Sequence, residues 1–98
     1  MLEFIKIHER DNVVVALRDY AKGETIHVDG QDTVLLEDVP RGHKIALSRI
    51  AEGENVLKYG YPIGHATQSI EVGEHIHTQN ARTNLTGVES YTYEPRLL

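Results

Sequence analysis

The sequence of 98 residues contains no cysteine. Disulfide bonds, thiolate nucleophiles and zinc sites built from thiolates are therefore excluded, and the redox compartment stays open. No stretch approaches the roughly 20 apolar residues that a membrane-spanning helix needs. Residues 1–6 show no basic segment followed by an apolar run, so we expect no signal peptide, no membrane association and a cytoplasmic location.

The chain also lacks a dense cluster of basic residues. Its net charge is −5, and the charge is uneven: residues 39–66 carry four basic and two acidic side chains, whereas residues 1–38 carry four and nine. Nucleic-acid-binding proteins usually present a concentrated basic face, so we expect no nucleic-acid partner. The basic middle segment either favours a small anion or is an ordinary solvated surface.

Length and composition favour one small domain. A chain of 98 residues with 40% hydrophobic content is a soluble globular domain with one modest core. A large substrate pocket needs concave walls and usually a second layer. We therefore expect that this chain alone does not enclose a complete active site.

Short β-type segments alternate with turn signals along the chain. Asp29-Gly30 is suited to the positive φ angles of a two-residue hairpin turn, and helical periodicity is weak, with at most one helical turn near residues 47–50. The sequence therefore predicts an all-β domain over residues 1–80 and a tail or linker over 81–98. The strands are expected at residues 2–8, 13–17, 26–28, 33–36, 44–47, 55–59, 63–66 and 75–78.

A Gly-Glu pair recurs before three of these segments, at Gly23, Gly53 and Gly73. Each pair is followed by one residue and then a β-branched apolar residue. The pattern indicates a tight turn, with glycine at positive φ, that leads into a strand. Chemistry by these glutamates is the alternative.

Histidines gather in the second half of the chain. His75 and His77 alternate, so on a strand both imidazoles project from the same face. Imidazole is the commonest metal ligand and titrates near neutral pH. His43 or His65 is a candidate third ligand, with Asn80 or water completing the shell. Hydrogen-bonded packing is the alternative role for the pair.

Arg41, His43 and Lys44 surround Gly42, a loop type that can hold a carboxylate by charge and by backbone N–H groups. The alternative is a charged turn that leads into a strand. Lysine and histidine are also candidates for proton abstraction next to a carboxylate if burial changes their pKa, and Lys58 follows later in the chain. The sequence has no phosphate-binding glycine loop, dinucleotide fingerprint or Ser-His-Asp order.

Three segments resemble the N-terminal domain of altronate dehydratases. They are RGHKIAL at residues 41–47, GENVLKYGYPIG at 53–64 and GEHIHTQN at 73–80. The likeness extends over essentially the whole chain and, more distantly, to galactarate dehydratase and the small subunit of sulfolactate sulfo-lyase. This domain type is the SAF domain, so the resemblance implies a β-clip fold.

The resemblance implies a hydro-lyase of hexuronate catabolism that converts altronate to 2-dehydro-3-deoxygluconate with a divalent metal, iron or manganese. The larger catalytic domain or subunit is absent from this sequence, so the chain alone is expected to be inactive. His43, His75 and His77 are the expected catalytic residues, and His75 and His77 the expected metal ligands. The residues expected to bind the anionic sugar acid are Arg41, Lys44, Lys58 and Asn80.

Two alternatives remain. The chain is either an accessory part of a dehydratase, with a sulfolactate sulfo-lyase subunit as a variant, or a stand-alone SAF module that binds a carbohydrate or a protein. The oligomeric state, a homo-oligomer included, stays open.

Overall fold

The computed structural model describes residues 3–84, which form nine strands and no helix. The all-β prediction is confirmed, and the described residues contain no helix able to cross a membrane. The strands are β1 (Phe4–Ile5), β2 (Val13–Ala16), β3 (Thr25–Val28), β4 (Gln31–Val34), β5 (Lys44–Ala46), β6 (Asn55–Lys58), β7 (Tyr61–Ala66), β8 (His75–Ile76) and β9 (Ala81–Thr83).

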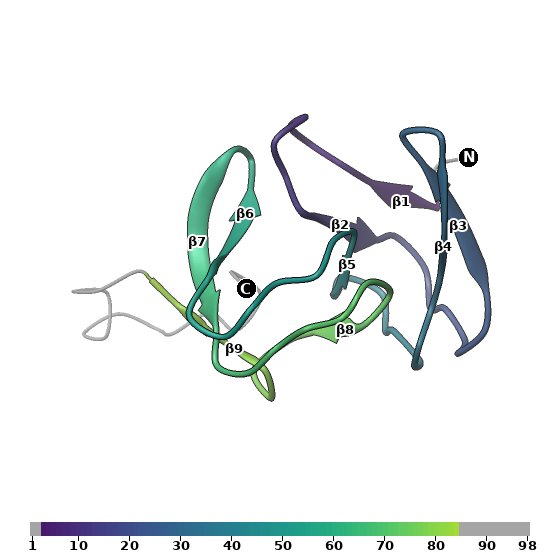
Figure 1. Cartoon of the computed structure of the whole chain (residues 1–98). Helices are drawn as coiled ribbons and strands as arrows, with labels where there is room; N and C mark the ends of the chain where they lie inside the picture. Colours follow the sequence, from purple (N-terminus) through teal and green to yellow (C-terminus); the bar gives the residue numbers. More distant parts are fainter. Residues whose placement is uncertain (1–2, 85–98) are drawn as a thin grey trace.

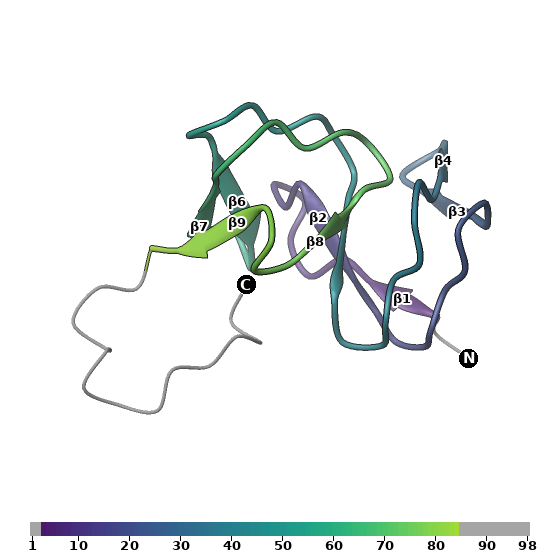
Figure 2. The same cartoon turned by 90° about the horizontal axis from the view of Figure 1, so that it is seen from below.

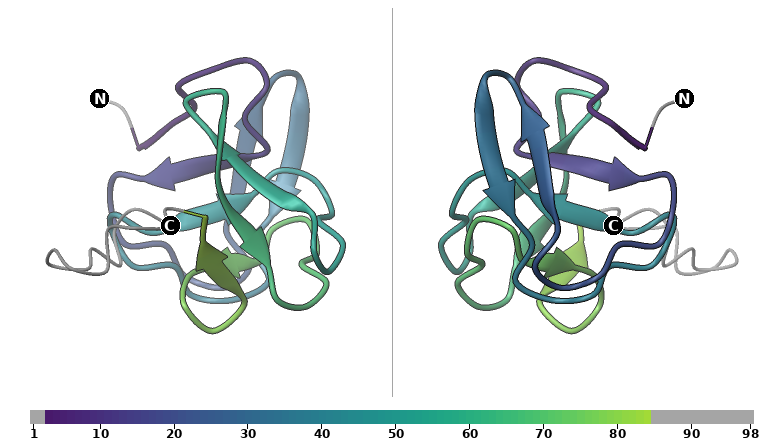
Figure 3. Two further views of the ribbon diagram at one scale, coloured as in Figure 1. Left: turned by 90° about the vertical axis from the view of Figure 1, so that its left-hand side faces the viewer. Right: turned by 90° about the vertical axis from the view of Figure 1, so that its right-hand side faces the viewer.

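Three small sheets build the domain. The central sheet has the order β1-β2-β5-β8, the β3-β4 hairpin lies at one end of the molecule, and the sheet β6-β7-β9 lies at the other (Figure 1). The view from below shows the same separation (Figure 2), and the two end-on views of Figure 3 bring one end and then the other to the front. All strand pairs are antiparallel.

The β3-β4 hairpin confirms the predicted Asp-Gly turn. Val28 pairs with Gln31, and the two residues between them, Asp29 and Gly30, have φ angles of 52° and 79°. Two successive positive φ angles match the twist of the flanking strands. Tyr59 and Gly60 make the equivalent turn between β6 and β7, with φ angles of 58° and 76°.

The three Gly-Glu turns are built alike, which confirms their structural reading. In each turn, the glutamate N–H donates to the carbonyl of the residue three positions earlier. The N–H of that earlier residue donates in return to the glutamate carboxylate. At Glu24 the carboxylate accepts from the Ala21 N–H at 2.7 Å, and at Glu54 from the Ala51 N–H at the same distance. The glutamates therefore close turns.

The two halves of the domain repeat one hydrogen-bond pattern, which the sequence did not reveal. Tyr20 and Val39 form an isolated antiparallel bridge, and Ile50 and Ile70 form its counterpart. The flanking backbone bonds also correspond, with offsets of about 30 residues, an internal repeat of the kind that a duplicated supersecondary unit produces.

Each half has its own buried core. The two cores lie on either side of the central sheet, because neighbouring residues of β5 point to opposite faces: Ile45 joins the first core and Ala46 the second. The first core consists of Val14, Ala16, Tyr20, Ile26, Val28, Leu35, Val39 and Ile45. The second consists of Val13, Ala46, Ile50, Val56, Ala66, Ile70, Ile76 and Ala81.

Some predicted elements differ from the structure. The helical turn expected near residues 47–50 is wrong, because Ile50 forms a β-bridge with Ile70. Strand β9 was not predicted, and it pairs with β7 inside the segment that the sequence assigned to the tail. The rest of that predicted tail, residues 85–98, lies outside the described residues.

Candidate functional site

Strand pairing brings three histidines together from distant parts of the chain. β5 pairs with β8, with Ile45 opposite His75, and this register places His43 beside both histidines of the second segment. The ring centroid of His43 lies 4.9 Å from that of His75 and 4.1 Å from that of His77. The interplanar angles of these two ring pairs are 25° and 26°. The ring centroids of His75 and His77 are themselves 6.1 Å apart, so the three imidazoles form one compact cluster, called the histidine stack below.

A hydrogen bond joins two of the rings. His43 Nδ1 and His75 Nε2 are 2.7 Å apart. The side-chain amide of Gln79 donates to the His75 carbonyl at 3.2 Å and faces His75 Nδ1 at 3.4 Å, so that Nδ1 is the acceptor nitrogen of His75. A neutral His75 then carries its proton on Nε2 and donates it to His43 Nδ1, which leaves the His43 proton on Nε2.

The stack favours neutral imidazoles. Burial lowers the pKa of His43, and the positive charge of neighbouring Lys44 lowers it further. Burial is also the largest cause that lowers the pKa of His75 and His77, followed by the mutual repulsion of the three rings when protonated. Near pH 7 the cluster can therefore accept a proton, as a general base must.

His43 occupies a position where the fold otherwise places a glutamate. Residues 40–43 form a fourth turn of the Gly-Glu type, with the His43 N–H donating to the Pro40 carbonyl at 3.0 Å and Gly42 at a φ of 87°. In the other three turns a glutamate caps the first N–H. Proline has no N–H to cap, so position 43 is released from this structural task and holds an imidazole.

Buried polar groups hold the histidine segment in place. Asn80 is fully buried; its amide donates to the His75 carbonyl at 2.8 Å and to a Glu74 oxygen at 3.0 Å, and its oxygen accepts from the His77 N–H at 3.1 Å. The hydrogen bonds of Asn80 are thus used inside the domain, and the residue orients the histidines. Glu37, which sequence reasoning missed, accepts from the His75 N–H at 2.9 Å. Glu37 and His75 are 38 residues apart, so no local pattern in the sequence indicated this contact.

The other predicted site residues are spread over the domain. Arg41 is exposed in the turn before His43. Lys44 is buried at the start of β5, directly after His43. Lys58 lies at the end of β6, with its ammonium 5.0 Å from the ring centre of Tyr59. His65 does not join the cluster, because it lies on β7 and contacts Asn84 at 2.8 Å.

The stacked rings do not fit a shared metal ion. The ring centroids of His75 and His77 are 6.1 Å apart, with the ring planes within 9° of parallel. The 2.7 Å contact between His43 and His75 is a hydrogen bond. Across residues 3–84, no group of three or more His, Cys, Asp or Glu side chains is arranged to hold a metal.

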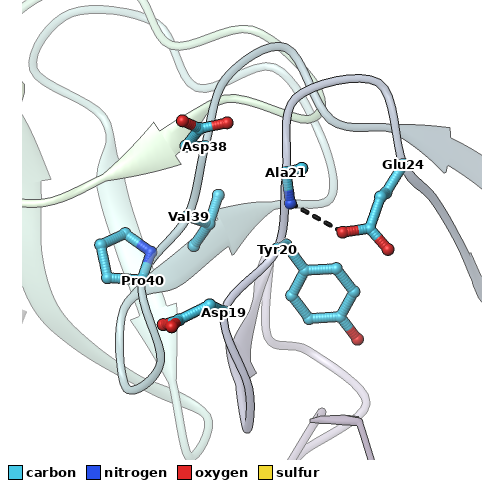
Figure 4. Close-up of a pocket in the computed structure, with 7 residues that line it drawn as sticks. All are labelled: Asp19, Tyr20, Ala21, Glu24, Asp38, Val39 and Pro40. Atoms are coloured by element: carbon cyan, nitrogen blue, oxygen red, sulfur yellow. Dashed lines mark hydrogen bonds between the residues drawn. The ribbon is translucent and has the colours of Figure 1, made fainter.

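A pocket of about 490 Å³ elsewhere on the domain contains none of the predicted site residues (Figure 4). Its carboxylates serve the backbone: Glu24 accepts from the Ala21 N–H, Asp19 from the Arg41 N–H and Asp38 from the Lys22 N–H. Glu24 closes a turn, and Asp19 and Asp38 join two segments that are distant in the sequence, so these carboxylates have structural roles and the histidine cluster is the better candidate site.

Comparison with known proteins gives the same domain type as the sequence motifs. Residues 2–84 match the altronate/galactarate dehydratase SAF domain. The chain is 53% identical over 96 residues to altronate dehydratase of Bacillus subtilis and 52% identical over 94 residues to that of Escherichia coli, covering 98% and 96% of this chain. It spans 19% of the length of each of these two relatives. It is also 37% identical over 90 residues to the (2R)-sulfolactate sulfo-lyase subunit alpha of Chromohalobacter salexigens, covering 84% of this chain and 95% of that subunit.

Proposed function

The chain belongs to the SAF domain family of altronate/galactarate dehydratases, and on that premise we propose that it supplies histidines to the active site of an altronate dehydratase. The larger part of the enzyme, in the same polypeptide or in a second subunit, supplies the rest of the site. The reaction is the removal of water from altronate to give 2-dehydro-3-deoxygluconate. Hexuronate catabolism and the cytoplasm are the proposed setting.

The single observation that carries this proposal is the stack of His43, His75 and His77 with lowered pKa values. Dehydration of a sugar acid begins with loss of the proton next to the carboxylate, which needs a base that is neutral at working pH. His77 is the proposed base, because no hydrogen bond within residues 3–84 occupies its ring nitrogens. The proton that His77 takes up leaves with the departing hydroxyl group as water, and His43, which stacks on His77 and is hydrogen-bonded to His75, is proposed to orient the His77 ring.

The proposed binding groups differ in what they can reach. Arg41 is exposed next to His43 and is the proposed contact for the substrate carboxylate, because its guanidinium can form two parallel hydrogen bonds. Asn80 is proposed to position the histidines, since its amide is already bonded within the domain. Iron or manganese stays a prediction for the whole enzyme, and no step proposed for this chain uses it.

The test is turnover of altronate by the complete enzyme with His43→Asn, His75→Asn or His77→Asn. Each substitution should lower kcat by roughly 10²- to 10⁴-fold, the usual contribution of general acid–base catalysis. His27→Asn is the matched control, because His27 lies on the exposed β3-β4 hairpin and contacts Asp32. Equal kcat values in the cluster variants and in the control would refute the proposal, provided that circular dichroism shows a native fold.

The second candidate function is C–S cleavage of (2R)-sulfolactate, favoured by the coverage of 95% of a sulfo-lyase subunit. The same complete enzyme would be offered altronate and (2R)-sulfolactate in parallel. Release of sulfite without dehydration of altronate would replace the first proposal with the second. If neither substrate is converted, a stand-alone binding module becomes the better account.

A further inference from the structure

Most of the exposed large aliphatic side chains of the domain gather at one place. Within residues 3–84 the exposed side chains of this kind are Ile7, Leu17, Val34, Leu36 and Val72. The last three lie where the segment that continues β4 runs beside the turn that leads into β8 (Figure 2). The exposed fractions of Val34, Leu36 and Val72 are 53%, 46% and 42%. These three residues are called the aliphatic strip below.

Backbone contacts hold the two segments of the aliphatic strip together. The Leu36 N–H donates to the Gly73 carbonyl at 3.0 Å. The Val34 carbonyl oxygen approaches Gly73 so closely that a Cβ built on this glycine would lie 2.1 Å from the oxygen. Only glycine permits such an approach of two backbones. The strip is therefore a fixed feature of the surface, although its two segments are distant in the sequence.

The strip is exposed because the fold uses the residue in between. Leu35 is 1% exposed and belongs to the first core. Neighbouring residues of an extended segment point to opposite sides, so Leu35 packs inwards while Val34 and Leu36 stay outside. Exposed apolar residues that stand alone are ordinary, whereas exposed apolar residues that lie together mark a contact with another surface. The grouping of the strip therefore calls for a partner.

The same two segments lead directly to the histidine stack. Glu37 follows Leu36 in the chain, and its carboxylate accepts a hydrogen bond from the His75 N–H at 2.9 Å. His75 in turn follows the Gly73 turn, and its ring is hydrogen-bonded to His43. A body that covers the strip is therefore held beside the histidine stack.

We propose that the aliphatic strip is the docking surface for the larger part of the enzyme. The chain spans 19% of the length of each altronate dehydratase described above, so most of each of those proteins lies outside the matched region. Groups of a shared active site must be held within about 0.5 Å of their working geometry, which requires a fixed contact between the two bodies. An apolar centre with a polar rim is the usual form of such a contact. The inference rests on the proposed function only for the existence of the larger part.

The test is photo-cross-linking in the complete enzyme, with p-benzoylphenylalanine in place of Leu36 or Val72. After irradiation and digestion, mass spectrometry identifies the captured peptide. Both positions should capture a peptide of the larger part. The matched control carries the same photo-reactive residue in place of Leu17, an exposed leucine outside the strip, and should capture no peptide of the larger part.

A second variant tests whether the strip itself makes the contact. Leu36→Asp, combined with the photo-reactive residue in place of Val72, should abolish the capture, because a carboxylate without a partner is costly to bury in an apolar contact. Leu17→Asp in the same background should leave the capture unchanged. Circular dichroism establishes that both variants are folded.

The proposal is overturned if the strip positions capture a peptide from residues 1–98 of a second copy, if they capture nothing in the folded enzyme, or if position 17 captures the larger part equally well. Capture of the larger part by an enzyme that does not dehydrate altronate would leave the docking surface intact and reject only the proposed function. Turnover of altronate without capture at the strip would do the reverse. The two proposals therefore fail independently.

Discussion

Replacing Lys44 by methionine should make the chain more stable at neutral pH. Methionine keeps an unbranched stem of similar length and can fill the same enclosed space. It removes the ammonium, which has no compensating partner within residues 3–84. Losing a charged group is therefore expected to raise the free energy of unfolding.

The magnitude follows from the pKa of Lys44. Burial and the repulsion by Lys58 lower it from the ordinary 10.5 to about 8. At 1.36 kcal/mol for each pKa unit, this difference corresponds to about 3 kcal/mol that opposes folding when both states are protonated. The expected gain for Lys44→Met is up to about 3 kcal/mol, a large fraction of the 5–15 kcal/mol typical of a domain.

The gain should depend on pH in one direction. Below about pH 8 the folded and unfolded chains both hold the Lys44 proton, and the cost is fully present. Between about pH 8 and 10.5 the folded chain loses the proton first, so the stability of the wild type rises with pH. The difference between Lys44→Met and the wild type should therefore be largest near pH 7 and disappear towards pH 10.5.

Urea unfolding at pH 7 and pH 10, followed by the fluorescence of the five tyrosines, measures this difference. The pKa of Tyr20 is also raised by burial, but Tyr20 is present in both proteins and cancels in the comparison. Lys22→Met, at an exposed turn, is the control and should change stability by less than about 0.5 kcal/mol. A Lys44→Met chain that is less stable than the wild type at pH 7 would refute the reasoning.

Four other predictions follow from the described contacts. Gly73→Ala should destabilise the chain by about 1 to 3 kcal/mol more than Gly53→Ala in urea unfolding. A Cβ added at Gly73 would lie 2.1 Å from the Val34 carbonyl oxygen, whereas a Cβ added at Gly53 would meet no atom within 4 Å. Equal losses of stability in the two variants would contradict this. Asp11→Ala should lower the free energy of unfolding by about 3 kcal/mol, because the Asp11 carboxylate accepts hydrogen bonds from the backbone N–H groups of residues 8, 59 and 60. A decrease below about 1 kcal/mol would show that water replaces the carboxylate. The stability of the chain should rise from pH 5 to pH 7. The pKa values of the stacked histidines are lowered in the folded chain, so the unfolded chain binds more protons in this range and is favoured at the lower pH. A free energy of unfolding that does not change between pH 5 and pH 7 would count against those shifts. Manganese should leave the unfolding midpoint of the 98-residue chain unchanged, and a clear increase would show that the histidines rearrange into a metal site.

Local patterns in the sequence predicted much of this fold. The Asp29-Gly30 hairpin and the three Gly-Glu turns depend on the φ preference of glycine and on hydrogen bonds three residues apart, so a short window contains the whole cause. Strand β9 was missed because it contains only three residues and its identity depends on pairing with β7. The false helical turn near residues 47–50 had a similar origin, since the bridge from Ile50 to Ile70 is not a local interaction.

The candidate site was predictable in its residues but less so in its geometry. His75 and His77 are two residues apart, and strand alternation places them on one face. The position of His43 beside both of them depends on the register of β5 against β8, which the sequence leaves open. The predicted grouping of Arg41, His43 and Lys44 around one anion stays a prediction: Lys44 is buried on β5, whereas Arg41 is exposed in the turn before it.

The shared central strand makes the two halves of the domain interdependent during unfolding. Ile45 and Ala46 are adjacent, yet they belong to different cores, so opening either core displaces the strand that the other core needs. Neither half can therefore melt while the other stays native. A fragment ending at residue 46 or beginning at residue 44 should remain unfolded, and the mixed fragments should regain structure only by pairing through β5.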